Sequence, residues 1–262
     1  MSARELLAAF DEQRARMPAR VPVGVVVERD GPLLRTTGRP HGGFVEYRDL
    51  AGLDGAALDE LIARQVRHFA ARGERFEWKQ YAHDLPRDLS DRLLAAGFVP
   101  EPEEAVAIAT AAAIAAEPAP PAGVALRDVG SETDIMRIAE LESRVYGVDH
   151  AWLGEQLAAQ RALAPEELVL TVAEAGGEVV SAAWTRLDGG TPFARLNGGA
   201  TLPRWRGRGI YRALVAHRAG LAVAGGFPYL QVDASAGSRP ILERLGFAVV
   251  ATTTPYIWTP PA

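Results

Sequence analysis

The same order of predicted elements occurs on both sides of a proline-rich segment, and this repeat constrains the fold more than any other feature of the sequence. Residues 117–123, with the sequence EPAPPAG, cannot continue a helix and are predicted to form a stiff connector. The glycines that frame the repeated order are 66 residues apart in the first half (Gly31 and Gly97) and 69 apart in the second (Gly177 and Gly246). Duplication of one α/β unit accounts for this match, with a coincidence of generic α/β patterning as the alternative.

The predicted elements give each half strands and helices in the same order, so the expected fold class is α/β. In the first half we expect strands at 23–28, 33–37, 44–48 and 76–81 and helices at 55–71 and 89–95. In the second half we expect strands at 168–174, 179–186, 195–201 and 229–233 and helices at 209–224 and 239–245. The expected domains are therefore 1–116 and 124–262, joined by the linker 117–123.

The composition argues against several classes of function. A net charge of −5 does not suit a general binder of polyanions such as nucleic acid, whereas it is compatible with a small cationic substrate. The chain has no cysteine, which removes disulfides, thiolate nucleophiles and cysteine-bound metals, and its five histidines lack metal-ligand spacing. No run approaches the ~20 apolar residues that cross a bilayer, and the first residues do not resemble a secretion signal. We therefore expect a cytoplasmic protein without a metal or a membrane partner.

The segment 203–214, with the sequence PRWRGRGIYRAL, has the features of a phosphate-binding turn between a strand and a helix. Free N–H groups and the helix dipole favour an anion at a helix start. Glycines at 207 and 209 let phosphate oxygens approach the main chain, and Arg204, Arg206 and Arg208 add positive charge. The segment is neither a nucleotide P-loop, since no G-K-[ST] follows, nor a G-x-G-x-x-G turn. We interpret it as a pyrophosphate cradle, with a tight structural turn as the alternative.

The helix after this turn is expected to be amphipathic. Apolar residues and one histidine recur at helical spacing and are predicted to be buried: Ile210, Ala213, Leu214, His217 and Leu221. Arg212 and Arg218 are expected to point away from this buried stripe.

These motifs resemble the GNAT superfamily of acyl-CoA N-acyltransferases. The family signature [QR]-x-x-G-x-[GA] is matched by Arg206 and Gly209, with Tyr211 as a departure. The segments 229–235 (YLQVDAS) and 241–247 (ILERLGF) are similar to the family's fifth strand and to its L-Y-E-K-x-G-F ending. The resemblance covers about residues 124–258. It extends to the first half only as a similar layout.

The resemblance implies tandem halves, each with a mixed, mostly antiparallel, twisted sheet flanked by helices. In the second half it implies that the fourth and fifth strands splay apart to hold acetyl-CoA, with the pantetheine arm along the fourth strand and the pyrophosphate on the turn. The residues implied to bind this co-substrate are Ala200, Thr201, Leu202, Arg206, Gly207, Arg208, Gly209, Ile210, Tyr211 and Ser235. Leu242 stands where many members have a tyrosine that protonates the leaving thiolate, and Ser235 replaces a frequent asparagine. The matching turn of the first half, residues 52–55, is acidic and lacks arginine, so we expect no cofactor site there.

Acyl transfer to an amine needs a neutral nitrogen, a polarised carbonyl and a protonated leaving thiolate. Asp233 is the expected base, with helix capping as its alternative, and Asn197 is expected to orient a water or the substrate. Tyr256 is a candidate proton donor if the last strand returns to the cleft, against a role in the core. A main-chain N–H near residues 200–202 would polarise the carbonyl, and the sequence Asn197-Gly-Gly favours a β-bulge just before it.

The segment that forms the acceptor wall in the family corresponds here to Glu142, Tyr146, Asp149 and His150. Either Tyr146 or His150 could act as an acid or a base, although a solvated surface role fits each of them as well.

The leading hypothesis from the sequence is an N-acetyltransferase that moves an acetyl group from acetyl-CoA directly to a small-molecule amine. An acyl-CoA-binding regulatory module without catalysis is the first alternative. An interaction protein on a decayed fold, without cofactor, is the second. The sequence is compatible with a homodimer.

Overall fold

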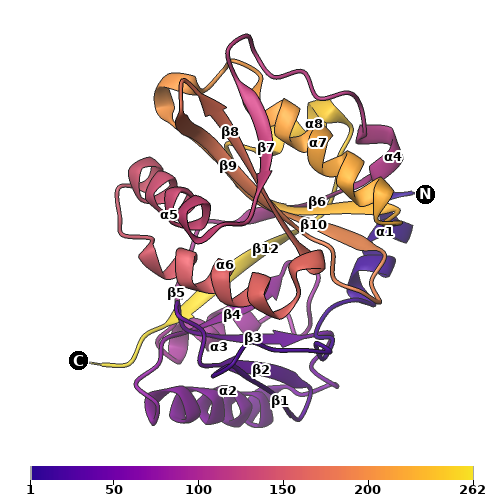
Figure 1. The fold of residues 1–262 in the computed structure, drawn as a ribbon. Helices are drawn as coiled ribbons and strands as arrows, with labels where there is room; N and C mark the ends of the chain where they lie inside the picture. The colour runs from indigo at the N-terminus through magenta and orange to yellow at the C-terminus, as the bar shows by residue number, and fades with distance from the viewer. Residues whose placement is uncertain (1, 262) are drawn as a thin grey trace. The chain divides into compact units, whose positions relative to one another are not determined.

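The computed structural model describes residues 2–261 and has the mixed α/β architecture expected from the sequence (Figure 1). The chain forms two compact units. The first unit contains the chain up to Val106 together with the segment that starts at Val249, and the second unit is Ala107–Ala248. No helix of the described residues is both long and apolar enough to cross a bilayer.

The first unit is built on a sheet with the strand order β1-β2-β3-β4-β12. Its elements are α1 (Ala3–Asp11), β1 (Val26–Asp30), β2 (Leu33–Thr37), β3 (Gly43–Tyr47), α2 (Gly55–Ala70), β4 (Phe76–Tyr81), α3 (Leu89–Ala95), β5 (Val99–Pro100) and β12 (Ala248–Trp258). Neighbouring strands are antiparallel except for the parallel pair β3 and β4. The short β5 pairs with β12.

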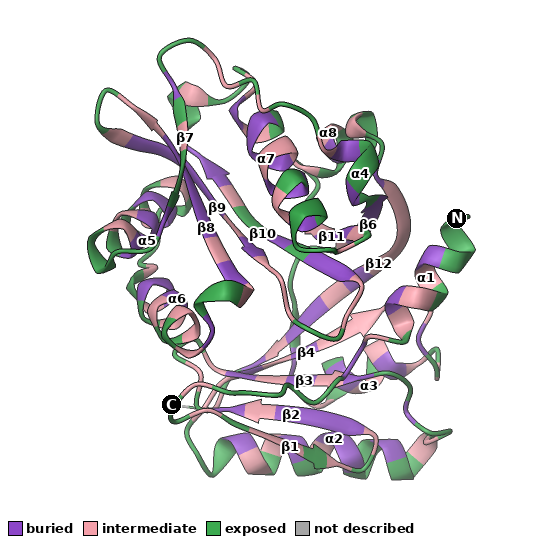
Figure 2. Cartoon of the chain, turned by 45° about the vertical axis from the view of Figure 1, so that its right-hand side comes forward, coloured by how far each residue is buried: buried purple, intermediate pink, exposed green. Residues whose placement is uncertain are grey.

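The second unit is built on a sheet with the strand order β6-β11-β10-β9-β8-β7. Its elements are β6 (Glu104–Thr110, from Ala107 on), α4 (Ala111–Ile114), β7 (Ala125–Val129), α5 (Glu132–Tyr146), α6 (Ala151–Leu163), η1 (Pro165–Glu167), β8 (Leu168–Ala175), β9 (Glu178–Arg186), β10 (Phe193–Thr201), η2 (Pro203–Trp205), α7 (Ile210–Ala224), β11 (Tyr229–Ala234) and α8 (Arg239–Leu245). Helices α5 and α6 lie on one side of the sheet and α7 and α8 on the other (Figures 1 and 2).

Two segments join a different unit from the one that their position in the chain suggests. Residues 107–116 follow the first repeat in sequence but are part of the second unit, and β12 follows the second repeat but pairs with β4 in the first. Residues 105–109 are buried on both faces of β6, as expected for an apolar run in the interior of a sheet. The division at residues 117–123 stays a prediction about the repeated halves, whereas the compact units divide within β6 and again at the start of β12.

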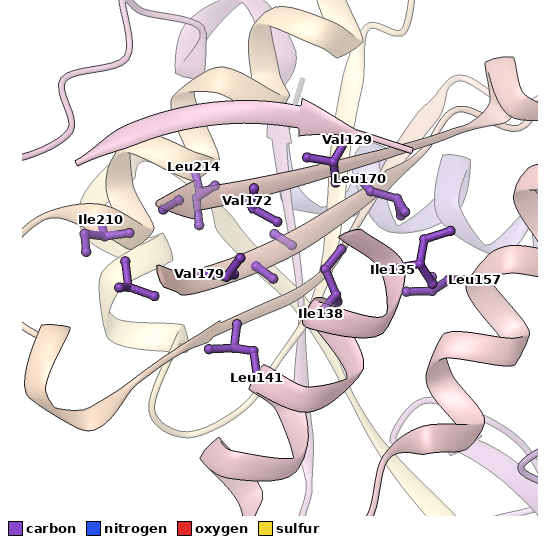
Figure 3. Packing of buried hydrophobic residues seen from close by; sticks show 14 of the residues in the cluster. Val129, Ile135, Ile138, Leu141, Leu157, Leu170, Val172, Val179, Ile210 and Leu214 are labelled. Carbon is purple, nitrogen blue, oxygen red and sulfur yellow. The ribbon is translucent and has the colours of Figure 1, made fainter. Parts of the chain in front are cut away.

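Each unit has its own hydrophobic core. The core of the second unit contains Ile138 and Leu141 of α5 together with Ile210 and Leu214 of α7, gathered on strands β8 and β9 (Figure 3). The core of the first unit is aromatic, with the rings of Phe69 and Phe76 stacked at 4.0 Å between centroids. Burial follows the inner faces of the sheets and helices in both units (Figure 2).

Candidate functional site

Strand β10 loses its neighbour β11 halfway along its length. The parallel pairing of the two strands runs from Phe193 opposite Tyr229 to Arg195 opposite Gln231, whereas the antiparallel pairing with β9 continues to Thr201. The register with β9 shifts between residues 198 and 200, so the bulge predicted from the sequence is confirmed. The last part of β10 therefore has one edge that is not used by the β10–β11 ladder, and such an edge can pair with an extended ligand.

The turn after β10 presents main-chain donors at the start of α7. Gly207 and Gly209 adopt positive φ angles of 72° and 89°, and a Cβ at residue 207 would meet no atom within 4 Å. Within residues 2–261, no protein group accepts a hydrogen bond from the N–H groups of residues 207–212, and Gly209 caps α7 without a side-chain bond. Free N–H groups beside glycines at the positive end of a helix dipole are suited to a phosphate group.

The three arginines of the turn have different partners. The Nε atom of Arg206 donates to the carbonyl of Thr201 at 3.0 Å and so ties the turn to the end of β10. The Arg208 guanidinium lies over the Trp205 ring, 4.8 Å from its centroid. Arg204 forms an ion pair with Glu178. Arg206 and Arg208 carry charge at the turn that no ion pair with a carboxylate offsets among the described residues.

The expectation for α7 was wrong at Arg218. This side chain is only 1% exposed, whereas His217 and Leu221 are half-buried. Arg218 lies seven residues after Tyr211 and four after Leu214, which puts all three on one face of the helix. The same helical spacing was the signal that could have shown the burial of Arg218.

Arg218 connects the helix to the bulge. Its Nη1 atom donates to the Asn197 carbonyl at 3.1 Å, and its Nε atom donates to the Leu214 carbonyl at 3.2 Å. The Arg218 guanidinium also donates a hydrogen bond to the Tyr211 hydroxyl. Burial raises the pKa of Tyr211, and the Arg218 guanidinium acts in the opposite direction. The Tyr211 ring packs so closely on Gly199 that a Cβ there would lie 2.7 Å from the ring.

We expect Gly199→Ala to destabilise the protein by about 1–3 kcal/mol, because Gly199 has a φ of 100° and its new methyl group would overlap the Tyr211 ring. Urea denaturation measures this effect. Gly220→Ala is the control, since a Cβ there meets nothing within 4 Å and alanine favours the helix by up to about 1 kcal/mol. Equal stability of Gly199→Ala and the parent protein would contradict the observed packing.

The other candidates at the end of β11 lie close to one another in sequence. Asp233 is half-buried and accepts a hydrogen bond from the Gln231 amide at 2.7 Å. Ser235 accepts from the Ser238 N–H at 3.3 Å, within the turn that leads to α8. The residue before α8 is Ser238, so Asp233 is not the N-cap of that helix. The Asn197 residue is exposed on β10.

The acceptor-wall candidates on and after α5 differ in their surroundings. Glu142 is only 4% exposed, its Oε1 atom has no hydrogen-bond partner, and burial raises its pKa to about 7. Burial and Glu142 raise the pKa of Tyr146, the last residue of α5, and Arg206 acts in the opposite direction. Asp149 accepts from the Ala151 N–H, and the His150 ring bonds the Val148 carbonyl. Glu142 follows the buried Ile138 by four residues on α5, so helical spacing was the signal that could have shown its burial.

Two further positions concern the proton donor. Leu242 is fully buried on α8, so its side chain is a core residue. Tyr256 belongs to the first unit, where it lies opposite Trp78 in the β4–β12 pair and is part of the aromatic core. Its hydroxyl bonds Ser90. These contacts correspond to the core alternative for Tyr256. Among the described residues, no group of histidine or carboxylate side chains is arranged to hold a metal.

Residues 135–247 match the model of the acetyltransferase (GNAT) family. A GCN5-related N-acetyltransferase from Kribbella flavida has a similar structure, with a TM-score of 0.68 at 17% identity over 99% of this chain and 95% of that one. A tandem GNAT protein from the clavulanic acid biosynthesis pathway has a TM-score of 0.64 at 13% identity, over 100% of this chain and 98% of its own. A GCN5-related N-acetyltransferase from Sphaerobacter thermophilus has a TM-score of 0.59 at 16% identity, over 90% and 83%.

Identities this low show a shared fold rather than a shared substrate. No curated protein matches the chain in sequence. The resemblance inferred from the segment 203–214 is confirmed by the family match, and the predicted fold class is confirmed by the structure and its neighbours.

Proposed function

We propose, on the premise that residues 135–247 form an acetyltransferase domain of the GNAT family, that this protein transfers an acetyl group from acetyl-CoA directly to an amine of a small molecule. The observation that carries the proposal is the row of main-chain N–H groups at residues 207–212 that no protein acceptor uses within the described chain. They lie at the end of a strand whose edge is open. Together these donors and this edge suit a long ligand with a diphosphate at one end.

In the proposed complex the turn binds the diphosphate and the last part of β10 binds the pantetheine arm. The glycines at 207 and 209 leave room beside the N–H groups, and Arg206 and Arg208 supply charge. Ala200, Thr201 and Leu202 offer main-chain groups to the arm, and Ser235 offers a hydroxyl from the end of β11. Of these, an N–H near Ala200 is the proposed donor to the thioester carbonyl.

An amine acceptor has to lose a proton before or during attack. An amine of the lysine type has a pKa of about 10.4, and each tenfold shortage of its neutral form costs about 1.36 kcal/mol. We assign the proton acceptor to Asp233, which the Gln231 amide holds in place at the end of β11. Asn197 would orient the amine or a water from the exposed side of β10. Glu142 on α5 is a second carboxylate of this unit, with a pKa of about 7 that suits a base.

The first unit is proposed to lack a cofactor site. Its helix α2 starts at Gly55 with Asp54 as the N-cap, so a carboxylate lies where a phosphate would have to bind. A negative charge at a helix start competes with an anionic ligand for the same dipole. The first unit is thus a repeat of the fold in which the anion site is replaced by an acidic residue.

A second candidate function is an acyl-CoA-binding module without catalysis. The observation that favours it is the buried Leu242, which cannot protonate a leaving thiolate. Such a protein would keep the phosphate site and would bind acyl-CoA without turnover.

Release of free thiol from acetyl-CoA across a panel of amines tests catalysis, and thermal unfolding with CoA tests binding. At a CoA concentration of 100 Kd, we expect about 2.7 kcal/mol of added stability. Stabilisation with turnover supports the transferase, and stabilisation without turnover supports the binding module. The absence of both stabilisation and turnover would contradict both functions.

A further inference from the structure

A buried guanidinium without a carboxylate partner is unusual, because an isolated charge in the protein interior is costly. Arg218 is 1% exposed, and no ion pair joins it to an acid among the described residues. Its partners are two main-chain carbonyls, those of Leu214 and Asn197, and the Tyr211 hydroxyl. The pair of Tyr211 and Arg218 therefore holds one net positive charge inside the second unit while Tyr211 is protonated.

Loss of the Tyr211 proton would make this pair neutral. The phenolate oxygen would lie beside the guanidinium, and opposite charges at hydrogen-bond distance in a buried place attract strongly. Burial alone opposes that loss, and Arg218 favours it, as their opposite effects on the pKa of Tyr211 show. The net effect is a raised pKa, so Tyr211 keeps its proton at neutral pH, and Arg218 reduces the cost of forming the phenolate.

The pair lies at the part of β10 that the proposed thioester would occupy. The Tyr211 ring packs on Gly199 within the bulge, and Arg218 bonds the carbonyl of Asn197 on the other side of it. Ala200, the first residue after the bulge, is the proposed partner of the thioester carbonyl. The reaction needs a proton at the sulfur beside this carbonyl, and the position of Leu242 does not supply one.

We propose that Tyr211 is the proton donor to the leaving sulfur and that Arg218 is the positioning residue that stabilises the resulting phenolate. The inference rests on the proposed transferase function. The acceptor nitrogen forms a bond to the carbonyl carbon, the carbon–sulfur bond breaks, and its electron pair stays on sulfur. The Tyr211 proton moves to that sulfur to give the free thiol. A cationic amine loses two protons in all: the first goes to Asp233 before attack, and the second, lost as the nitrogen becomes an amide, restores Tyr211, so that no further reactant is needed.

The test compares Tyr211→Phe, Arg218→Met and Arg218→Lys with the parent protein, using acetyl-CoA and an amine that the parent acetylates. Tyr229→Phe is the control, because it removes a tyrosine hydroxyl from β11 of the same unit. Tyr211→Phe keeps the ring that packs on Gly199, so the fold and the bulge should persist. We expect its kcat to fall about 10²-fold or more, as for loss of a general acid, with the KM for acetyl-CoA and the thermal stabilisation by CoA within about threefold of the parent.

The arginine variants separate an electrostatic role from packing. We expect Arg218→Met to lower kcat to a similar extent and Arg218→Lys, which keeps a cation, to recover at least a tenth of the parent rate. A kcat for Tyr211→Phe within twofold of the parent would overturn the proposal, and so would an equal loss of kcat and of CoA affinity. If Arg218→Met does not fold, the kcat of Tyr211→Phe still tests whether Tyr211 is the proton donor. A parent protein that turns over no amine contradicts the transferase function itself, which is a separate result.

Discussion

Replacing Gly209 by aspartate is expected to abolish acyl-CoA binding and leave the protein folded. The new carboxylate would stand at the start of α7, beside the N–H groups proposed to hold the diphosphate. Two unit charges about 4 Å apart repel by about 4 kcal/mol near a protein surface, which corresponds to about a 10³-fold loss of affinity. Calorimetric titration with CoA measures this loss, and the thermal unfolding of the unliganded protein checks the fold.

The control for this variant is Gly176→Asp. Gly176 lies in the turn between β8 and β9 of the same unit, also has a positive φ, and has no neighbour within 4 Å of a new Cβ. It therefore reproduces the added charge and the backbone strain without touching the turn at 207–212. Unchanged CoA affinity of Gly209→Asp, or an equal loss in both variants, would refute the phosphate site.

The second large effect is expected from Glu142→Gln, which should make the free energy of unfolding less dependent on pH. Burial raises the pKa of this carboxyl group from 4.5 to about 7, so the folded state prefers the protonated form. The protonated carboxyl group therefore stabilises the folded state fully below about pH 4.5, and this stabilisation is lost as the pH rises through 7. The rise in pKa corresponds to about 3 kcal/mol. Glutamine does not ionise and does not suffer this loss.

The measurement is the free energy of unfolding of parent and Glu142→Gln at pH 4 and pH 8. We expect the difference between the two proteins to change by about 3 kcal/mol in favour of glutamine at the higher pH. Any fixed cost of a buried amide cancels in this comparison. Glu140→Gln on the exposed face of the same helix is the control and should follow the parent. Parallel pH profiles of Glu142→Gln and the parent would show that the Glu142 carboxyl is not buried in the folded protein.

The geometry of the turn at residues 207–212 could be predicted because its determinants are local. Glycines at 207 and 209, the arginines around them and the helix that follows occupy one short stretch, and the structure brings them together as free donors at a helix start. The bulge at residues 198–200 was equally local, since two adjacent glycines indicated it. Local geometry depends on neighbours in sequence, and a sequence shows those directly.

The features that escaped prediction depend on contacts between distant residues. The helical spacing of α7 indicated that Arg218 is buried. It did not indicate the partner that stabilises the buried guanidinium, the Asn197 carbonyl, which lies beyond the point where the β10–β11 pairing ends. The burial of Glu142 similarly requires the packing of α5 on β9 and β10. Strand β12 follows the second repeat in the sequence, and its own residues do not indicate with which strand it pairs.

The placement of β12 has a consequence for biosynthesis. The ribosome makes residues up to Val106 before the second unit, yet the sheet that they build is completed only by a strand that starts at Ala248. The edge of β4 therefore has to wait for the entire second unit to be translated, at about 5–20 residues per second. An unfinished sheet edge attracts foreign strands. The first unit of a nascent chain of this protein would consequently be the part in need of a chaperone, although it leaves the exit tunnel before most of the second unit.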